Sequence, residues 1–155
     1  MTELLQVDGA EMLRHLVALA IAYVLALPIG WNREREERSA GIRTFPLVAV
    51  ACCGFILAAE SVVREEPEAM ARVVEGLITG MGFIGGGAIL KVKNSVKGTA
   101  TAASLWVTGA IGVAVALNSL DVAIMLAVIS FLTLYLLAPL KKIAEQDSDR
   151  PAADE

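Results

Sequence analysis

Cysteine, histidine and aromatic residues are scarce in this sequence. The chain of 155 residues contains two cysteines and one histidine, and aromatic residues make up 5% of it. Cys52 and Cys53 are adjacent, a spacing that does not readily reach disulfide geometry, and there is no third thiol. A disulfide framework and a four-thiolate zinc site are therefore excluded. We interpret both thiols as small packing residues.

The sequence also offers little for catalysis. No nucleophile and base are placed together, and His15, the single histidine, is remote from the basic loops described below. We therefore expect no enzymatic activity and no cofactor.

Apolar residues are abundant and lie in long runs. The chain is 56% hydrophobic with a mean hydropathy of +0.64, and the apolar runs cover 12–29, 44–63, 72–90, 99–117 and 121–138. About 18 to 20 helical residues cross a hydrocarbon core of roughly 30 Å. Because lipid cannot satisfy backbone polar groups, such runs must be helices. The sequence predicts an all-α fold, a polytopic transmembrane bundle of five helices over 1–140. We expect Pro139 to end the fifth helix and 141–155 to form a short disordered cytoplasmic tail.

Lysine and arginine alternate between the loops. The first, third and final connections are basic, and the cations in them are Arg33, Arg35, Arg38, Arg43, Lys91, Lys93, Lys97, Lys141 and Lys142. Basic loops stay in the cytoplasm, so this pattern predicts an outside N-terminus and a cytoplasmic C-terminus. Acids rather than cations precede the first run, which is not typical of a cleaved signal peptide, and we expect the first helix to be retained.

The third run is rich in glycine. On a helical wheel one face is small and polar, with Glu75, Thr79, Gly82 and Gly86, and the opposite face carries Leu77, Met81, Ile84 and Ala88. The fourth run has a similar stripe, made of Thr101, Ser104, Thr108 and Gly112. Because small residues let helices approach closely in lipid, we expect these two faces to pack together, within one chain or across a dimer.

Two features of the third run have alternative interpretations. The glycines, which include Gly80, Gly85, Gly86 and Gly87, favour close packing or, alternatively, a locally unwound segment that lines a polar cavity. Glu75 is either an interfacial carboxylate that is hydrated from outside or paired with Arg72, or a cation or proton ligand and then a weak candidate for a metal site.

The two inner loops are candidates for anion binding. Their polar residues are Arg33, Glu34, Arg35, Arg43 and Thr44 in one loop, and Ser95, Lys97, Gly98 and Thr99 in the other. The second loop leads into a helix that Ser95 or Thr99 would cap, so free N–H groups and nearby cations would bind a phosphate or carboxylate. The alternative is a solvated basic surface on anionic lipid. Glu34 pairs with the arginines or, alternatively, ligates a cation.

Three linked motifs resemble the MgtC/SapB family of bacterial inner-membrane proteins. The first is Gly30-x-x-Arg33-Glu34 followed by Ala40-Gly41-Ile42-Arg43-Thr44, the second is Gly80-Met81-Gly82-Phe83-Ile84-Gly85-Gly86-Gly87, and the third is Ser95-Val96-Lys97-Gly98-Thr99-Ala100-Thr101-Ala102-Ala103-Ser104-Leu105-Trp106. The resemblance covers roughly 16–137. The family usually has Arg where this chain has Lys97. Lysine keeps the positive charge but weakens a bidentate clamp. Longer members carry a cytoplasmic C-terminal domain that does not follow here.

The resemblance implies a function linked to magnesium limitation, virulence and, in some members, restraint of the proton-driven ATP synthase. We predict a multi-pass protein of the bacterial inner membrane that contributes to magnesium homeostasis or membrane energetics by binding a partner complex or a cytoplasmic anion. The alternative is a small homo-oligomeric transporter of ions (Mg²⁺ or proton-coupled) or solutes. The expected partners are anionic lipid headgroups, a second copy, with a dimer favoured, and another membrane protein, but not nucleic acid.

Overall fold

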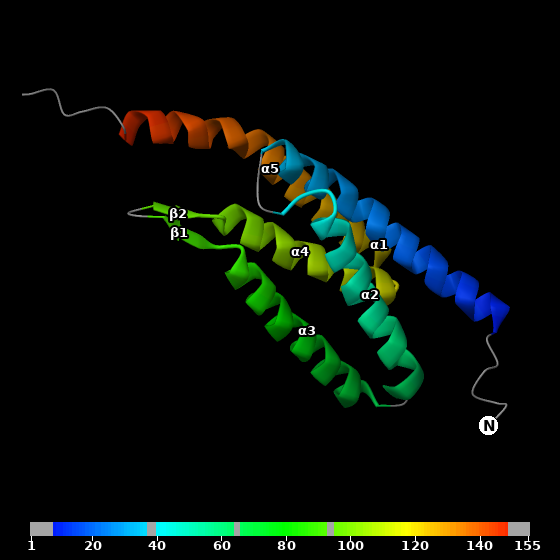
Figure 1. Ribbon diagram of the computed structural model, residues 1–155. Coiled ribbons are helices and arrows are strands. Elements are labelled where there is room, and N and C mark those ends of the chain that lie inside the picture. The colour runs from blue at the N-terminus through cyan, green and yellow to red at the C-terminus, as the bar shows by residue number, and fades with distance from the viewer. Residues whose placement is uncertain (1–7, 37–39, 64–65, 93–94, 149–155) are drawn as a thin grey trace, which may run out of the picture.

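Five helices and one short hairpin make up the computed structural model, which describes residues 8–36, 40–63, 66–92 and 95–148. The helices are α1 (Gly9–Arg35), α2 (Thr44–Val63), α3 (Pro67–Gly87), α4 (Thr99–Ala116) and α5 (Leu120–Ser148). Strands β1 (Leu90–Val92) and β2 (Ser95–Lys97) lie between α3 and α4 (Figure 1). The predicted all-α bundle of five helices is confirmed.

Four of the helices are long and apolar enough to cross a membrane: α1, α2, α4 and the part of α5 that ends at Ala138. Helix α3 has 21 residues, about 31 Å at 1.5 Å per residue, and is therefore also long enough. It carries Glu68, Arg72 and Glu75, which lower its hydropathy. A membrane crossing by α3 stays a prediction.

The helix ends differ from those predicted where charged or special residues intervene. Asp8 caps α1 by accepting a hydrogen bond from the Ala10 N–H at 2.9 Å, and α1 continues to Arg35, since helical hydrogen bonds do not stop where the apolar run stops. Helix α3 begins at Pro67, where a missing N–H costs nothing, and ends earlier than predicted.

The predictions for the C-terminal end were partly wrong. Helix α5 passes through Pro139 and continues to Ser148, so the disordered tail predicted from 141 is helical over 141–148, and 149–155 lie outside the described residues. A proline removes one helical hydrogen bond, which does not always end a helix.

The connection between α3 and α4 is an antiparallel hairpin rather than the predicted loop. Leu90 pairs with Lys97, Lys91 with Val96 and Val92 with Ser95. Gly98 is the N-cap of α4, with φ of +90° and no side-chain cap bond. A β-carbon there would collide with the Ala88 carbonyl oxygen. The prediction that Ser95 or Thr99 caps this helix was therefore wrong.

Helix α4 is the centre of the bundle and packs against all four other helices. It carries the buried side chains of Leu105 and Ile111. Gly112 lies directly against α2, where a β-carbon would meet the carbonyl oxygen of Ala49 and lie 3.1 Å from the Cys53 nitrogen. Cys52 and Cys53 are both buried in this core, as free thiols.

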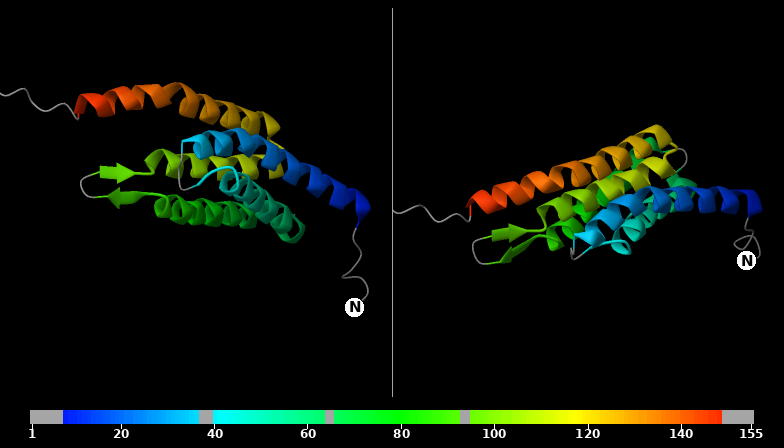
Figure 2. Two further views of the ribbon diagram at one scale, coloured as in Figure 1. Left: turned by 45° about the horizontal axis from the view of Figure 1, so that its top comes forward. Right: turned by 90° about the horizontal axis from the view of Figure 1, so that it is seen from above.

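The two ends of the bundle differ in structure. The end of α1, the start of α2, the hairpin and the start of α4 lie at one end, which we call the hairpin end (Figure 1). The hairpin and the last part of α5 project beyond the other elements there (Figure 2). The two interhelical loops that the sequence predicts to be cytoplasmic, between α1 and α2 and between α3 and α4, are both at the hairpin end.

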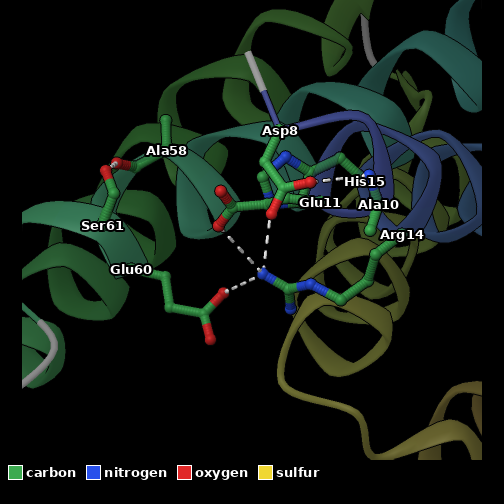
Figure 3. A network of polar contacts seen from close by, with 8 residues as sticks. All are labelled: Asp8, Ala10, Glu11, Arg14, His15, Ala58, Glu60 and Ser61. Carbon is green, nitrogen blue, oxygen red and sulfur yellow. Dashed lines mark hydrogen bonds and ion pairs between the residues drawn. The ribbon is translucent and has the colours of Figure 1, made fainter. Parts of the chain in front are cut away.

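At the opposite end, polar side chains join α1 to α2. Arg14 Nη2 donates to Glu60 Oε2 at 3.3 Å and lies 3.8 Å from Glu11 Oε1 and 3.2 Å from His15 Nε2 (Figure 3). Because the Arg14 and Glu60 side chains are 42% and 36% exposed, this pair contributes modestly to stability. His15 and Glu60 both contact Arg14 here.

Candidate functional site

The end of α1 is packed tightly onto the segment that begins α2. Glu34 Oε2 accepts a hydrogen bond from the Ile42 N–H at 3.1 Å. A β-carbon on Gly41 would collide with the Glu34 carboxylate, and one on Gly30 would lie 3.1 Å from the Ile42 α-carbon. The glycines of the first motif therefore allow this close approach, and Glu34 holds the turn. This is a third role for Glu34, beside the two that the sequence left open.

Arg33 joins α1 to α4 rather than facing solvent. Arg33 is 5% exposed and Thr101 is 1% exposed. Arg33 Nη2 donates a hydrogen bond to the Thr101 hydroxyl at 3.4 Å. The first and third motifs therefore meet inside the protein. The neighbouring Asn32 has a buried Oδ1 that accepts no hydrogen bond in the described part of the chain.

The polar stripe of α4 is buried, and the hydroxyls of Ser104 and Thr108 donate to carbonyls of their own helix. Ser104 Oγ donates to the carbonyls of Ala100 and Thr101 at 2.8 and 3.0 Å, and Thr108 Oγ1 donates to the Ser104 carbonyl at 2.8 Å. The stripe begins at the Arg33 contact with α1 and ends at Gly112 against α2.

Helices α3 and α4 do pack together, but the predicted faces were wrong. Met81 and Gly85 are the buried residues of α3. A β-carbon on Gly109 of α4 would lie 3.1 Å from Met81 Cγ, and one on Gly85 would lie 3.5 Å from the Ala102 carbonyl oxygen. The wheel separates the two faces of α3 correctly but cannot tell which one faces the bundle, and the small residue that admits Met81 is on α4.

The opposite side of α3 is uncovered. We call it the glycine face, and it consists of Glu75, Thr79, Gly82 and Gly86, all of which are exposed. No atom lies within 4 Å of a β-carbon built on Gly82 or Gly86, and the same holds for Gly80 and Gly87. Because α3 stays helical through Gly87, the alternative of an unwound glycine segment was wrong.

Three predicted anion-binding cations remain accessible at the hairpin end. Arg35, Arg43 and Lys97 are exposed, in contrast to Arg33. In the described ranges, no hydrogen bond or ion pair holds any of these three side chains. Thr44 is half-buried at the start of α2, and Gly98 and Thr99 follow Lys97 into α4.

A cavity between α2 and α3 is a feature that the sequence did not reveal. It has a volume of about 1120 Å³. We call it the α2–α3 groove, and its lining includes Leu47, Ala51 and Phe55 of α2 and Gly76, Gly80 and Phe83 of α3, with Arg43 and Thr44 at one end. The signal was present in α2 as apolar residues at helical spacing, but that spacing equally fits core or lipid contact.

The described residues offer no cluster of metal ligands. Among them, no group of three His, Cys, Asp or Glu side chains is placed to hold a metal ion. Glu75 is therefore not part of such a group in the described part of a single chain.

Comparison with known proteins decides the family. The sequence profile of the MgtC family matches residues 19–143. The chain belongs to the MgtC family. Protein MgtC of Salmonella typhimurium is 36% identical over 102 residues, which cover 66% of this chain and 43% of that protein. Protein SrpB of Synechococcus elongatus is 33% identical over 138 residues, which cover 81% of this MgtC-family chain and 76% of SrpB.

Other relatives extend beyond the matched region. A Synechocystis protein is 38% identical over 97 residues, which cover 63% of this chain and 41% of that protein. The MgtC-family chain thus spans about two fifths of the length of the first curated relatives it matches. No solved structure matches it.

Proposed function

We propose that this MgtC-family protein contributes to magnesium homeostasis or membrane energetics as a non-enzymatic, multi-pass protein of a bacterial inner membrane. It acts by binding a partner protein complex or a cytoplasmic anion at the hairpin end. Support comes from the family and from the four apolar helices. The virulence link that the resemblance implies belongs to the same proposal.

The observation that carries this proposal is the set of contacts at the hairpin end. The contacts of Arg33 with Thr101 and of Glu34 with Ile42 fix three helix ends relative to one another. Around them, Arg35, Arg43 and Lys97 are exposed and hold no carboxylate among the described residues. An anionic group that binds these cations does not first have to break an ion pair among the described residues. The charge-assisted hydrogen bonds are therefore gained at little cost.

The proposed orientation places the hairpin end in the cytoplasm. Lysine and arginine resist translocation, so the exposed cations at this end favour a cytoplasmic location. The opposite end carries Glu66 and Glu68. The N-terminus is then outside, and the C-terminus is in the cytoplasm.

A complementation experiment tests the function. In a bacterium whose own gene is deleted, the wild-type protein should restore growth in low magnesium, and Arg43→Ala combined with Lys97→Ala should not. Ala20→Leu, an exposed change on α1 away from the hairpin end, is the control for expression and insertion. Full growth with the double variant would refute the role of the cations.

The transport alternative requires Glu75 on a path through the membrane. Glu75 lies on the exposed glycine face, whereas Gly76 and Gly80 line the α2–α3 groove. Purified protein in liposomes separates the two functions. Magnesium or proton flux that disappears in Glu75→Gln would favour transport, and flux equal to that of empty liposomes would favour regulation.

We also propose that two copies associate through the glycine face of α3. Gly82 and Gly86 are exposed on α3, and a β-carbon built on either meets no atom of another helix within 4 Å. A second α3 would approach closely over these two glycines, because small residues let helices pack tightly in lipid. This interface leaves the α2–α3 groove open, since the groove is on another side of α3.

A further inference from the structure

The α2–α3 groove follows the length of α2. Its α2 lining begins at Thr44 in the first turn and continues through Leu47, Ala51 and Phe55 to Ala59. These residues span about 22 Å at 1.5 Å per residue, which exceeds the roughly 15 Å depth of one leaflet of a 30 Å hydrocarbon core. The groove is therefore long enough for one acyl chain of the adjacent leaflet.

The wall of the groove is apolar and its volume is large. Its 1120 Å³ is slightly above the range of about 300–1,000 Å³ that is usual for ligand pockets. Gly76 and Gly80 deepen the α3 side, since neither has an atom within 4 Å of a β-carbon built on it. Phe55 and Phe83 form part of the rim and are 62% and 86% exposed.

One end of the groove carries a positive charge. Arg43 and Thr44 line this end, and none of the described residues that line the groove is acidic. Arg43 immediately precedes α2, which is apolar enough to cross a membrane, so its guanidinium is near the depth of lipid phosphates. The positive end of the α2 dipole is at the same level.

From this combination we infer that the α2–α3 groove binds one anionic phospholipid, with an acyl chain between α2 and α3 and the phosphate at Arg43. The inference goes beyond the proposed function, because it requires neither magnesium nor a protein partner, although it shares Arg43 with the anion site. A second copy is a worse fit for this groove, since a transmembrane helix offers no anion to Arg43 at that depth.

The two parts of the site have separable effects. Bilayer hydrocarbon is as apolar as the groove, so the chain gains little from entering it, and the preference among lipids must come from the headgroup. In detergent, by contrast, retention of the lipid depends on how well the groove holds the chain. Changing Arg43 should therefore alter selectivity, and filling the groove should alter retention.

Native mass spectrometry of the purified full-length protein measures both quantities. The probe is an equimolar mixture of phosphatidylglycerol and phosphatidylcholine with identical chains. We expect one lipid per chain, with phosphatidylglycerol preferred about tenfold, or roughly 1.4 kcal/mol, because the choline cation of phosphatidylcholine offsets the attraction between its phosphate and Arg43. Arg43→Gln should reduce the ratio to about one, and Arg43→Lys should give an intermediate value. Arg72→Gln removes an exposed cation that does not line the groove and should leave the ratio unchanged.

Two variants fill the groove without touching Arg43. Ala51→Leu and Gly80→Leu each add a side chain into it, and we expect at least a tenfold loss of both retained lipids. Ala20→Leu, at an exposed position of α1 outside the groove, should retain lipid like the wild type. Retention that is the same in all three variants would overturn the inference.

Other occupants give different results. If the groove binds a second copy, Ala51→Leu and Gly80→Leu will change the oligomer mass and not the bound lipid. If only the headgroup is recognised, inorganic phosphate will displace phosphatidylglycerol. Either result would overturn the inference. Growth of Gly80→Leu in low magnesium keeps the two proposals apart, since lost lipid with normal growth would leave the function in place.

Discussion

Replacing Gly112 by alanine is the sharpest test of the packing between α2 and α4. The added β-carbon would collide with the Ala49 carbonyl oxygen and lie 3.0 Å from the carbonyl carbon and 3.1 Å from the Cys53 nitrogen. These are backbone atoms of a packed helix, so the helices must separate. Overpacking of this kind costs about 1–3 kcal/mol, of which a better helix propensity returns about 1 kcal/mol.

A matched control is available in the same pair of helices. Gly54 of α2 is also helical, but its β-carbon would have only Leu19 Cδ2 nearby, at 3.9 Å. Gly54→Ala should therefore gain about 0.5–1 kcal/mol from propensity alone. The measurement is the free energy of unfolding of both variants in the same detergent, with tryptophan fluorescence as the probe. The reasoning is refuted if Gly112→Ala is as stable as Gly54→Ala.

Three further changes test the contacts described above. Arg33→Ala should destabilise the protein by about 1–3 kcal/mol, because the buried Thr101 hydroxyl loses its donor, and unchanged unfolding would contradict the link between the motifs. Gly41→Ala should displace the Glu34 carboxylate and cost about 1 kcal/mol, and most of that cost should vanish in a Glu34→Ala background, so additive effects would count against the contact. Gly82→Leu should convert dimers to monomers in detergent without loss of thermal stability, because it meets no neighbour in the monomer, and an unchanged mass by light scattering would remove the glycine face as the interface.

The helices were predictable because lipid does not satisfy backbone polar groups, so long apolar runs must be helical. The range of α2, 44–63, was predicted correctly, since its apolar run begins and ends with the helix. In α1 the run ended before the helix, because Arg33 and Arg35 are helical although charged. The hairpin was not predictable, because three-residue strands that contain lysine lack the alternation that marks a longer strand.

The site was predictable as a set of residues but not as an arrangement. The motif residues Arg33 and Thr101 were selected in separate segments, and only the fold shows that they meet in the interior. Sequence assigned Arg33 and Arg43 the same role, since a charge in a loop gives no sign of its burial. The face of α3 that packs on α4 was also misassigned, because the partner of Met81 is a glycine on another helix, which the sequence of α3 does not reveal.

The central claim is that the hairpin end lies in the cytoplasm, and accessibility of single cysteines tests it most directly. In a background with Cys52→Ala and Cys53→Ala, Lys97→Cys reports the hairpin end and Ser61→Cys the opposite end, both at exposed positions. A membrane-impermeant maleimide added to intact cells should label Ser61→Cys at once and Lys97→Cys only after the inner membrane is permeabilised. Labelling of Lys97→Cys in intact cells, with Ser61→Cys protected, would contradict the account.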